Sequence, residues 1–260
     1  MPDQRVALVT GASSGIGYAT ALVFARSGWH VTATARRVDR LAQLEREVNQ
    51  LNRPHGELLT IVADVRKADE VQNAVAQTVQ RFGRLDILVA NAGVGQRGSI
   101  VEAEWSDLET VLRTNIDGVL HSIRAAVPAM RQAEGGQIIL ISSVVSNMPA
   151  PYAATYAASK AFISNLANSL RLELKDDNVH VTTILVGQTH TEFAEKRLGK
   201  PGRVASRLPT MTAEQVAKAV VFSVERKPDT VVLRWLDRLI ILGNTLAPSL
   251  VGRIARRLYK

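Results

Sequence analysis

Cysteine is absent from the 260-residue chain, so disulfide bonds, thiolate metal ligands and cysteine nucleophiles are excluded. Aromatic residues make up only 5% of the sequence. A basic groove studded with aromatic residues is missing, and so is a known nucleic-acid motif, so no nucleic-acid partner is expected. Three histidines that invite an acid/base or metal role (His121, His180 and His190) are scattered without metal-ligand spacing. We therefore predict no metal site and assign them no catalytic role.

The N-terminus also lacks the pattern of a secretory leader, in which a charged region precedes a long apolar stretch and a cleavage site. An apolar strand is expected within a few residues of Met1. A cytoplasmic enzyme is the default expectation.

The bulk composition indicates one globular unit. Hydrophobic residues make up 46% and charged residues 22% of the chain, as in ordinary folded proteins. No linker is visible, so residues 1–260 are predicted to form a single domain. The net charge of +8 is concentrated at one end, since six basic residues and one acid lie between Arg234 and Lys260.

Short apolar runs alternate with helical periodicity along the chain. Seven of them are predicted strands: Arg5 to Thr10, Trp29 to Thr34, Leu58 to Val62, Ile87 to Ala90, Gln137 to Ile141, Val179 to Leu185 and Thr230 to Leu233. They are continuously apolar, as expected when helices cover both faces of a parallel sheet. The fold class is therefore α/β, a doubly wound parallel sheet of the Rossmann type, which binds ligands at the carboxyl ends of its strands.

The first predicted strand ends in a glycine-rich turn, from Gly11 to Gly17, before a helix expected over Tyr18 to Arg26. Such glycines allow a tight turn and a close approach of backbone to a pyrophosphate at a helix N-terminus. The spacing TGxxxGxG resembles the short-chain dehydrogenase/reductase family, as do Asp64-Val65 after the third strand and Asn91-Ala92-Gly93 after the fourth. The resemblance implies that these positions bind the cofactor: Gly11, Ser13, Ser14, Gly15, Ile16, Gly17, Asp64, Val65, Asn91, Ala92 and Gly93.

The residues after the second strand predict which cofactor binds. No acid lies between Tyr18 and Val38 to bond an adenosine ribose, whereas Arg36 and Arg37 stand at the strand's end. Guanidinium groups can bind a 2′-phosphate bidentately. The sequence thus favours NADP(H) over NAD(H), the alternative being two solvated surface arginines.

Tyr156 and Lys160 form a YxxxK pair whose four-residue spacing places both side chains on one helix face. A nearby ammonium favours the phenolate and lets a tyrosine exchange a proton near neutral pH. By itself the pair could be an ordinary helix surface. The resemblance implies catalytic and cofactor-binding roles for both, with Lys160 holding the nicotinamide ribose. It also implies a substrate-orienting role for Ser143, with Ser142 as its competitor, and a water-anchoring role for Asn115, which is expected in a long helix from about Ser106.

The pattern departs from the family after the sixth strand, where Val186 replaces a usual proline. Gly187, Thr189 and Thr191 are still expected to contact the nicotinamide end. Residues 187–212 have little periodicity and are predicted to form a lid over substrate and cofactor.

The tail, residues 234–260, carries apolar residues at helical spacing and is expected to form two helices punctuated by Gly243 and Pro248. Neither helix is long enough to span a membrane. Packing on its own domain, covering the substrate cleft or joining a homodimer or homotetramer interface is favoured over peripheral membrane contact.

These observations predict an NADP(H)-dependent oxidoreductase that acts on a small-molecule carbonyl/alcohol pair. Candidate substrates are a 3-oxoacyl thioester, a steroid or another ketone, which the fold class does not separate. The alternative is a nucleotide-binding sensor or a membrane-associated scaffold that has lost turnover.

Overall fold

The computed structural model describes residues 5–51, 55–199 and 210–259. Its centre is a parallel sheet of seven strands in the order β11-β7-β6-β4-β1-β2-β3. The strands are β1 (Val6–Thr10), β2 (His30–Ala35), β3 (Leu58–Val62), β4 (Ile87–Ala90), β6 (Gly136–Ser143), β7 (Val179–Val186) and β11 (Thr230–Val232). The seven predicted strands are confirmed, with ends that move by one or two residues at most.

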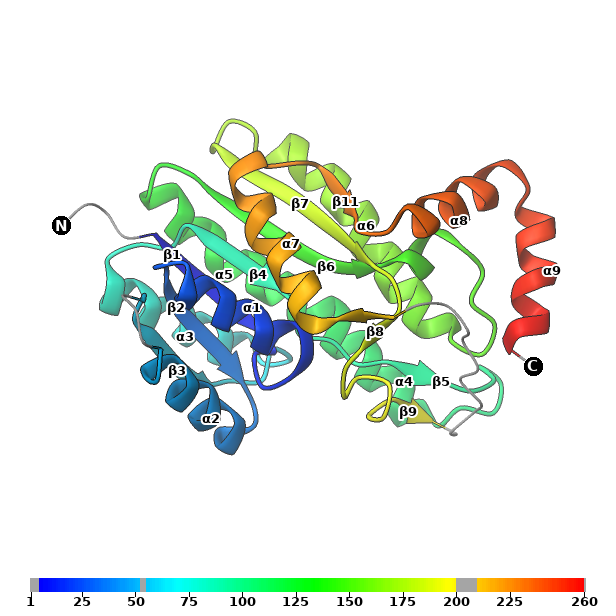
Figure 1. Ribbon diagram of the computed structural model, residues 1–260, viewed down its shortest axis with the longest axis horizontal. Coiled ribbons are helices and arrows are strands. Elements are labelled where there is room, and N and C mark those ends of the chain that lie inside the picture. The colour runs from blue at the N-terminus through cyan, green and yellow to red at the C-terminus, as the bar shows by residue number, and fades with distance from the viewer. Residues whose placement is uncertain (1–4, 52–54, 200–209, 260) are drawn as a thin grey trace.

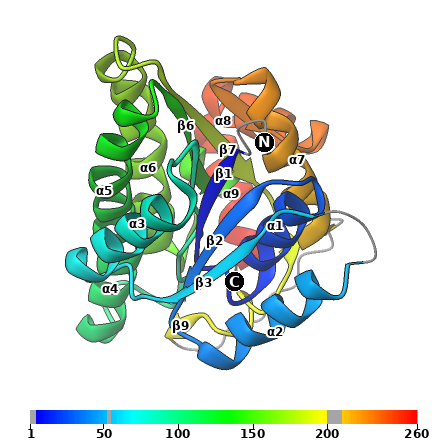
Figure 2. The same cartoon turned by 90° about the vertical axis from the view of Figure 1, so that its left-hand side faces the viewer.

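Helices cover both faces of this sheet (Figure 2). One face carries α1 (Gly15–Arg26), α2 (Val38–Asn49) and α7 (Ala213–Arg226), and the other carries α3 (Ala68–Phe82), α5 (Gly118–Gln132) and α6 (Ala154–Glu173). Every residue of β1 and β4 is buried as a result. Two apolar clusters form, one on each side, around Phe24 and around Ile163. The doubly wound α/β prediction is therefore correct.

The strand order reverses at β1, which pairs with β2 on one side and β4 on the other. A crevice opens at such a switch point, beyond the carboxyl ends of the strands. The glycine-rich turn, the Asn91 turn and Ser143 all follow strands at this edge.

The long helix expected near Ser106 is present but interrupted. It consists of α4 (Trp105–Leu112), a π-helical turn (Arg113–Asp117) and α5. Single π-turns inside helices occur often at functional sites. Asn115 stands in the middle of this one.

The predicted lid holds three short strands that its sequence did not indicate, and they take part in two pairings. β8 (Thr189–His190) pairs with β10 (Met211–Thr212), and β9 (Leu198–Gly199) pairs with β5 (Gln96–Arg97). Residues 200–209 of the expected lid lie outside the described residues. The described part crosses the carboxyl edge of the sheet between β8 and β9 (Figure 1).

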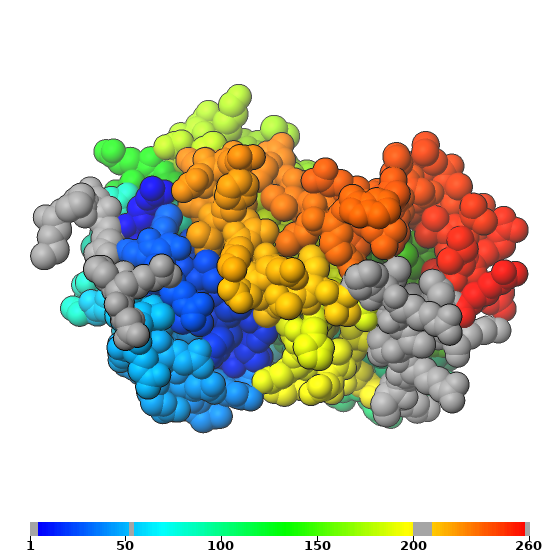
Figure 3. All heavy atoms as spheres, viewed as in Figure 1, coloured from blue at the N-terminus to red at the C-terminus, as the bar shows by residue number. Residues whose placement is uncertain are grey.

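The tail forms α8 (Trp235–Leu246) and α9 (Pro248–Tyr259), which project from one end of the molecule (Figures 1 and 3). The expected break at Gly243 is wrong, because α8 continues through this glycine and ends at Leu246. Pro248 starts the second helix, where its missing N–H costs nothing. Within the described ranges, no helix is long and apolar enough to cross a membrane.

Candidate active site

The backbone of the glycine-rich turn leaves no room for side chains, which allows the close approach that a dinucleotide phosphate would need. Gly11 has a φ of +68°, and a Cβ atom there would lie 2.7 Å from the Cα of Ala92. A Cβ atom at Gly17 would lie 2.4 Å from the side-chain nitrogen of Asn91. The turn opens α1, whose free N–H groups and positive end favour an anion.

Thr10, which the sequence analysis did not select, locks the Asn91 turn to the glycine turn. Its hydroxyl accepts hydrogen bonds from the backbone N–H groups of Asn91 and Ala92, both at 3.1 Å. The Asn91 side chain donates back to the carbonyl of Thr10 at 2.9 Å. Asn91 therefore holds two turns together, with its amide directed at β1.

Arg37 reaches the glycine turn and Arg36 does not. The Arg37 guanidinium donates to the hydroxyl and the carbonyl of Ser13, both at 3.2 Å. Arg40, which sequence reasoning missed, joins Arg37 at the carboxylate of Glu192. The three-residue spacing of the two arginines, which places them on one side of the start of α2, could have identified it.

Arg36 is exposed, and its charge acts on Asp64. Burial raises the pKa of Asp64, but hydrogen bonds from Arg66 outweigh it, with a smaller contribution from the charge of Arg36, and hold that pKa below its usual range. The Arg66 guanidinium bonds both carboxylate oxygens, at 3.0 Å from Nε to Oδ1 and 2.6 Å from Nη2 to Oδ2. Asp64 and Arg36 thus follow the ends of β3 and β2, and Val65, which comes after Asp64 in the chain, is buried.

Tyr156 and Lys160 lie on α6, as predicted, and Lys160 is the more deeply buried. The Lys160 ammonium lies 6.0 Å from the centroid of the Tyr156 ring. Burial lowers the pKa of Lys160 from 10.5 to about 8. A cation that can lose its proton near neutral pH is therefore held beside the tyrosine.

Ser143 ends β6 and caps the 3-10 turn that follows (Val144–Asn147). Its hydroxyl donates to the carbonyl of Val186 at 3.2 Å and lies 3.4 Å from the N–H of Val145. Ser142 points the other way, into the α6 side, where its hydroxyl donates to the carbonyl of Lys160 at 3.0 Å. Of the two serines, Ser143 lies beside the strand end that leads to Gly187.

Asn115 is fully buried, and its amide binds the backbone that follows the Asn91 turn. Its oxygen accepts from the N–H of Val94 at 2.8 Å, and its nitrogen donates to the Val94 carbonyl at 3.0 Å and to the Ser159 hydroxyl at 2.9 Å. A Cβ atom at Gly93 would lie 3.2 Å from the Asn115 oxygen and 3.5 Å from the Lys160 ammonium. Asn115 and Lys160 therefore meet at Gly93.

The segment after β7 brings Thr191 to the glycine turn and Phe193 to Tyr156. Thr191 lies over the glycine turn, where a Cβ atom at Gly15 would be 3.3 Å from its side chain. The Thr189 hydroxyl donates to the carbonyl of Gly187 at 3.2 Å. Phe193, another residue not selected from the sequence, packs its ring 5.6 Å from that of Tyr156.

Gly187 is required by an ion pair that the sequence did not reveal. A Cβ atom there would lie 2.3 Å from a carboxylate oxygen of Asp237 and 2.4 Å from a guanidinium nitrogen of Arg234. These two side chains form a two-point ion pair, at 2.7 Å and 2.5 Å, with Asp237 almost fully buried. The start of α8 therefore packs closely against the residue that follows β7.

Comparison with known proteins places these features in a family. The family model described as short chain dehydrogenase matches residues 5–201. A curated relative, 11-beta-hydroxysteroid dehydrogenase 1A of Arabidopsis thaliana, is 33% identical over 267 aligned residues, which cover 98% of this chain and 75% of the relative.

Two solved structures carry the comparison further. The closed form of a serine dehydrogenase complexed with NADP+ is 30% identical, covers 88% of this chain and 94% of its own, and superposes with a TM-score of 0.79. A Burkholderia phymatum enzyme in complex with NAD has a TM-score of 0.86 over 95% of both chains, and at 22% identity shows the fold alone. Structures alike in fold thus hold either nicotinamide dinucleotide. The chain belongs to the short-chain dehydrogenase family of oxidoreductases.

Proposed function

We propose that the protein is an NADP(H)-dependent oxidoreductase that interconverts a ketone or aldehyde and the corresponding alcohol. The observation that supports this most strongly is that the Lys160 ammonium lies 6.0 Å from the Tyr156 ring centroid and bonds the carbonyl of Ile141, two residues before Ser143 on β6. Arg37 in turn bonds Ser13 of the glycine turn. The dinucleotide, when bound, supplies or accepts the hydride at the substrate carbon.

The protein's own residues handle the substrate oxygen. Tyr156 gives or takes a proton there, and Ser143 donates a hydrogen bond that orients the carbonyl and stabilises the charge that develops on its oxygen. Lys160, while charged, favours the phenolate of Tyr156. Asn115 is a positioning residue, because its side chain is engaged by Val94 and Ser159 and acts on the reaction through them.

NADP(H) is proposed over NAD(H) because the region after β2 is cationic. Arg37 and Arg40 converge on one carboxylate beside Ser13, a geometry that also suits a phosphate. Arg36, whose charge acts on Asp64, is proposed to contact the adenine side of the same ligand. The cofactor contacts expected from Gly187, Thr189 and Thr191 belong to this proposal as well.

The proposed test measures NADPH consumption with a panel of ketones and aldehydes, using the native protein and Tyr156→Phe. Native protein is expected to turn over at least one carbonyl, while Tyr156→Phe binds NADPH with nearly native affinity and turns over none. Lys160→Ala is expected to lose both activity and affinity.

The same panel separates the enzyme from the alternative of a cofactor-binding sensor or scaffold. A sensor would bind NADPH tightly but would not consume it with any carbonyl of the panel, and Tyr156→Phe would not change this result. A Tyr156→Phe protein that retains most of its turnover across pH would remove tyrosine from the mechanism.

A homo-oligomer is proposed because the tail leaves apolar side chains exposed in a single chain. About half or more of the surface is exposed for five apolar side chains of the tail: Leu239, Leu242 and Leu246 of α8, and Leu250 and Ile254 of α9. Burial of a leucine or isoleucine stabilises a protein by about 1.5 to 3 kcal/mol, which favours a covering partner or substrate for this surface.

A further inference from the structure

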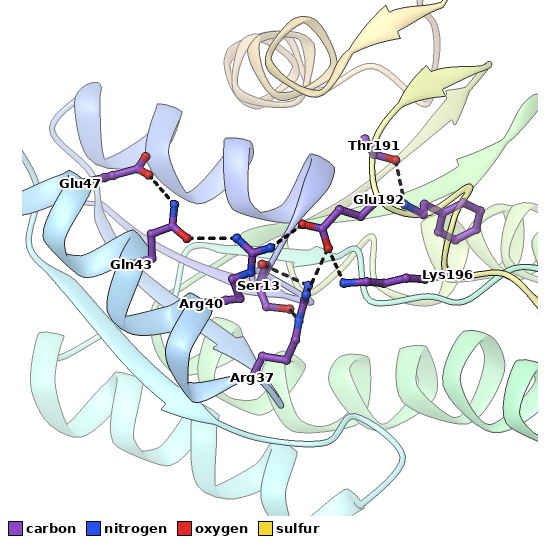
Figure 4. Close-up of polar contacts among 9 residues, drawn as sticks. Ser13, Arg37, Arg40, Gln43, Glu47, Thr191, Glu192 and Lys196 are labelled. Atoms are coloured by element: carbon purple, nitrogen blue, oxygen red, sulfur yellow. Dashed lines mark hydrogen bonds and ion pairs between the residues drawn. The ribbon is translucent and has the colours of Figure 1, made fainter.

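The carboxylate of Glu192 lies between the cations that the proposed function assigns to the 2′-phosphate (Figure 4). One oxygen is 3.1 Å from Nη1 of Arg37 and the other is 2.9 Å from Nη2 of Arg40. Lys196 forms an ion pair with the same carboxylate from the opposite side. Three cations therefore surround one internal anion.

Glu192 reaches this position from the segment that crosses the carboxyl edge of the sheet. In the space-filling view, the segment from about residue 188 to 199 lies against the surface of the first helices (Figure 3). The two residues that flank Glu192 are both engaged: Thr191 faces Gly15 of the glycine turn, and Phe193 packs on Tyr156. Glu192 is thus held between the cofactor turn and the catalytic helix.

Arg37, one of the two arginines that hold Glu192, is also fixed to the glycine turn. Arg37 uses its Nε and Nη2 groups on Ser13 and its Nη1 group on Glu192. Arg40 in turn is oriented by the Gln43 side chain, which accepts from its Nη1 at 3.1 Å. Both guanidinium groups are pre-oriented toward the point where the carboxylate lies, which is the arrangement that a bound phosphate needs.

The carboxylate stays charged under working conditions. Hydrogen bonds from Lys196 and Arg37 lower the pKa of Glu192 to about 2. The side chains of Glu192, Arg37 and Arg40 are each about one third exposed, so water can replace these contacts and the ion pairs can open without unfolding.

We infer that Glu192 is a cofactor-specificity residue, an internal anion that occupies the site of the 2′-phosphate until NADP(H) displaces it. The inference rests on the proposed NADP(H) site at Arg37. A 2′-phosphate has to compete with the carboxylate for Arg37 and Arg40, whereas the 2′-hydroxyl of NAD(H) carries no charge that competes. Glu192 therefore weakens binding of the phosphorylated cofactor selectively. Once Glu192 is displaced, Arg40 joins Arg37 as a ligand of the 2′-phosphate.

The test uses adenosine 2′,5′-bisphosphate and adenosine 5′-monophosphate as probes, titrated calorimetrically into the full-length protein. Glu192→Gln is expected to bind the bisphosphate about threefold to tenfold more tightly than native protein, as expected for removing partly exposed ion pairs. Binding of the monophosphate should remain unchanged. Glu192→Ala should behave as Glu192→Gln does, and serves if the glutamine variant fails to fold.

Glu195→Gln is the matched control, since it removes the same charge three residues further on from an exposed position. It should change neither affinity, which excludes a general charge effect. Equal bisphosphate affinities in Glu192→Gln, Glu195→Gln and native protein would overturn the inference.

Arg37→Ala distinguishes a failure of the inference about Glu192 from a failure of the proposed NADP(H) site. If the 2′-phosphate adds affinity that Arg37→Ala removes, the NADP(H) site stands whatever Glu192 does. If native protein binds both probes equally and Arg37→Ala changes nothing, the proposed site and the inference about Glu192 fall together.

Discussion

The ammonium of Lys160 donates a 2.8 Å hydrogen bond to the backbone carbonyl of Ile141, inside the protein and away from bulk water. This carbonyl belongs to β6, two residues before Ser143. One hydrogen bond compensates only part of the cost of burying a cation. The pKa of Lys160 is therefore lowered to about 8, and the charge that assists Tyr156 depends on pH.

The rate of carbonyl reduction is expected to fall as the pH rises through about 8, because Lys160 then loses its proton. The measurement is the pH profile of kcat/KM with NADPH. Lys160→Arg keeps its charge over this range, so any residual activity of that variant should lack the fall near pH 8. The same inflection in both proteins would assign it to another group.

Stability should show the opposite trend with pH. Between the folded pKa of about 8 and the unfolded value of 10.5, the unfolded chain binds more protons, so the contribution of Lys160 to the free energy of unfolding increases as the pH rises. Lys160→Met is expected to be more stable than native protein at pH 7 and to lose this advantage toward pH 10.5. Urea unfolding at several pH values measures the difference, and a constant difference would contradict the buried charge.

The cofactor preference should depend on Arg37 more than on Arg36. Removing a charge-assisted contact to phosphate costs about 1.5 to 3 kcal/mol, or one to two decades of affinity. Arg37→Ala is expected to weaken NADPH binding by about that factor and to leave NADH binding unchanged. Arg36→Ala serves as the comparison, because Arg36 does not contact Ser13. It should weaken NADPH binding less than Arg37→Ala does.

The double variant Arg36→Asp with Arg37→Ala should reverse the preference toward NADH, since it removes the phosphate ligand and supplies an acid for the ribose. Fluorescence titration with both cofactors measures the ratio of dissociation constants. An unchanged ratio would show that the 2′-phosphate, if bound, lies elsewhere.

Asn115→Ala should lower the free energy of unfolding as well as the activity. It leaves the part-buried N–H and carbonyl groups of Val94 without their partner, which costs about 1 kcal/mol. Ser159→Ala, which removes one of the three contacts of Asn115, should cost less. Urea unfolding measures both, and an Asn115→Ala protein of native stability would show that the amide is not what holds the turn.

Gly187→Ala is expected to destabilise the protein by about 1 to 3 kcal/mol through overpacking. The added Cβ atom would collide with both partners of the Arg234–Asp237 ion pair. Gly243→Ala, inside α8, is the control, because a Cβ atom there would meet only Cγ2 of Val251, at 3.9 Å. That change should stabilise the protein by about 0.5 to 1 kcal/mol. Equal effects in the two variants would contradict the close packing of the Arg234–Asp237 pair on Gly187.

A chain that ends at Leu246 tests the tail while leaving the Arg234–Asp237 pair in place. Loss of α9 removes Ala255, which is buried, together with the exposed apolar residues and the basic residues that follow Pro248. We expect a smaller assembly by light scattering, a lower Tm or a higher KM for bulky substrates. Unchanged values for all three, combined with loss of binding to anionic vesicles, would instead make the tail a membrane contact.

The sequence by itself determined the sheet and the position of the site. The seven strands are continuous apolar runs, and such runs leave little choice once helices cover both faces. The glycine turn, Asn91, Ser143 and the Tyr156–Lys160 pair follow or face strand ends, so their order along the chain already places them at one edge. Local patterns sufficed because each of these features is set within a few neighbouring residues.

Only the tertiary structure decided which side chains meet across that edge. Glu192 lies 155 residues from Arg37 along the chain, and the reason for a glycine at position 187 is an ion pair fifty residues later. Such contacts carry no periodicity or motif, because they depend on how separate strand ends and α8 are brought together in space. For the same reason the break at Gly243 was predicted wrongly, since a glycine ends a helix only where the surrounding packing does not hold the helix together.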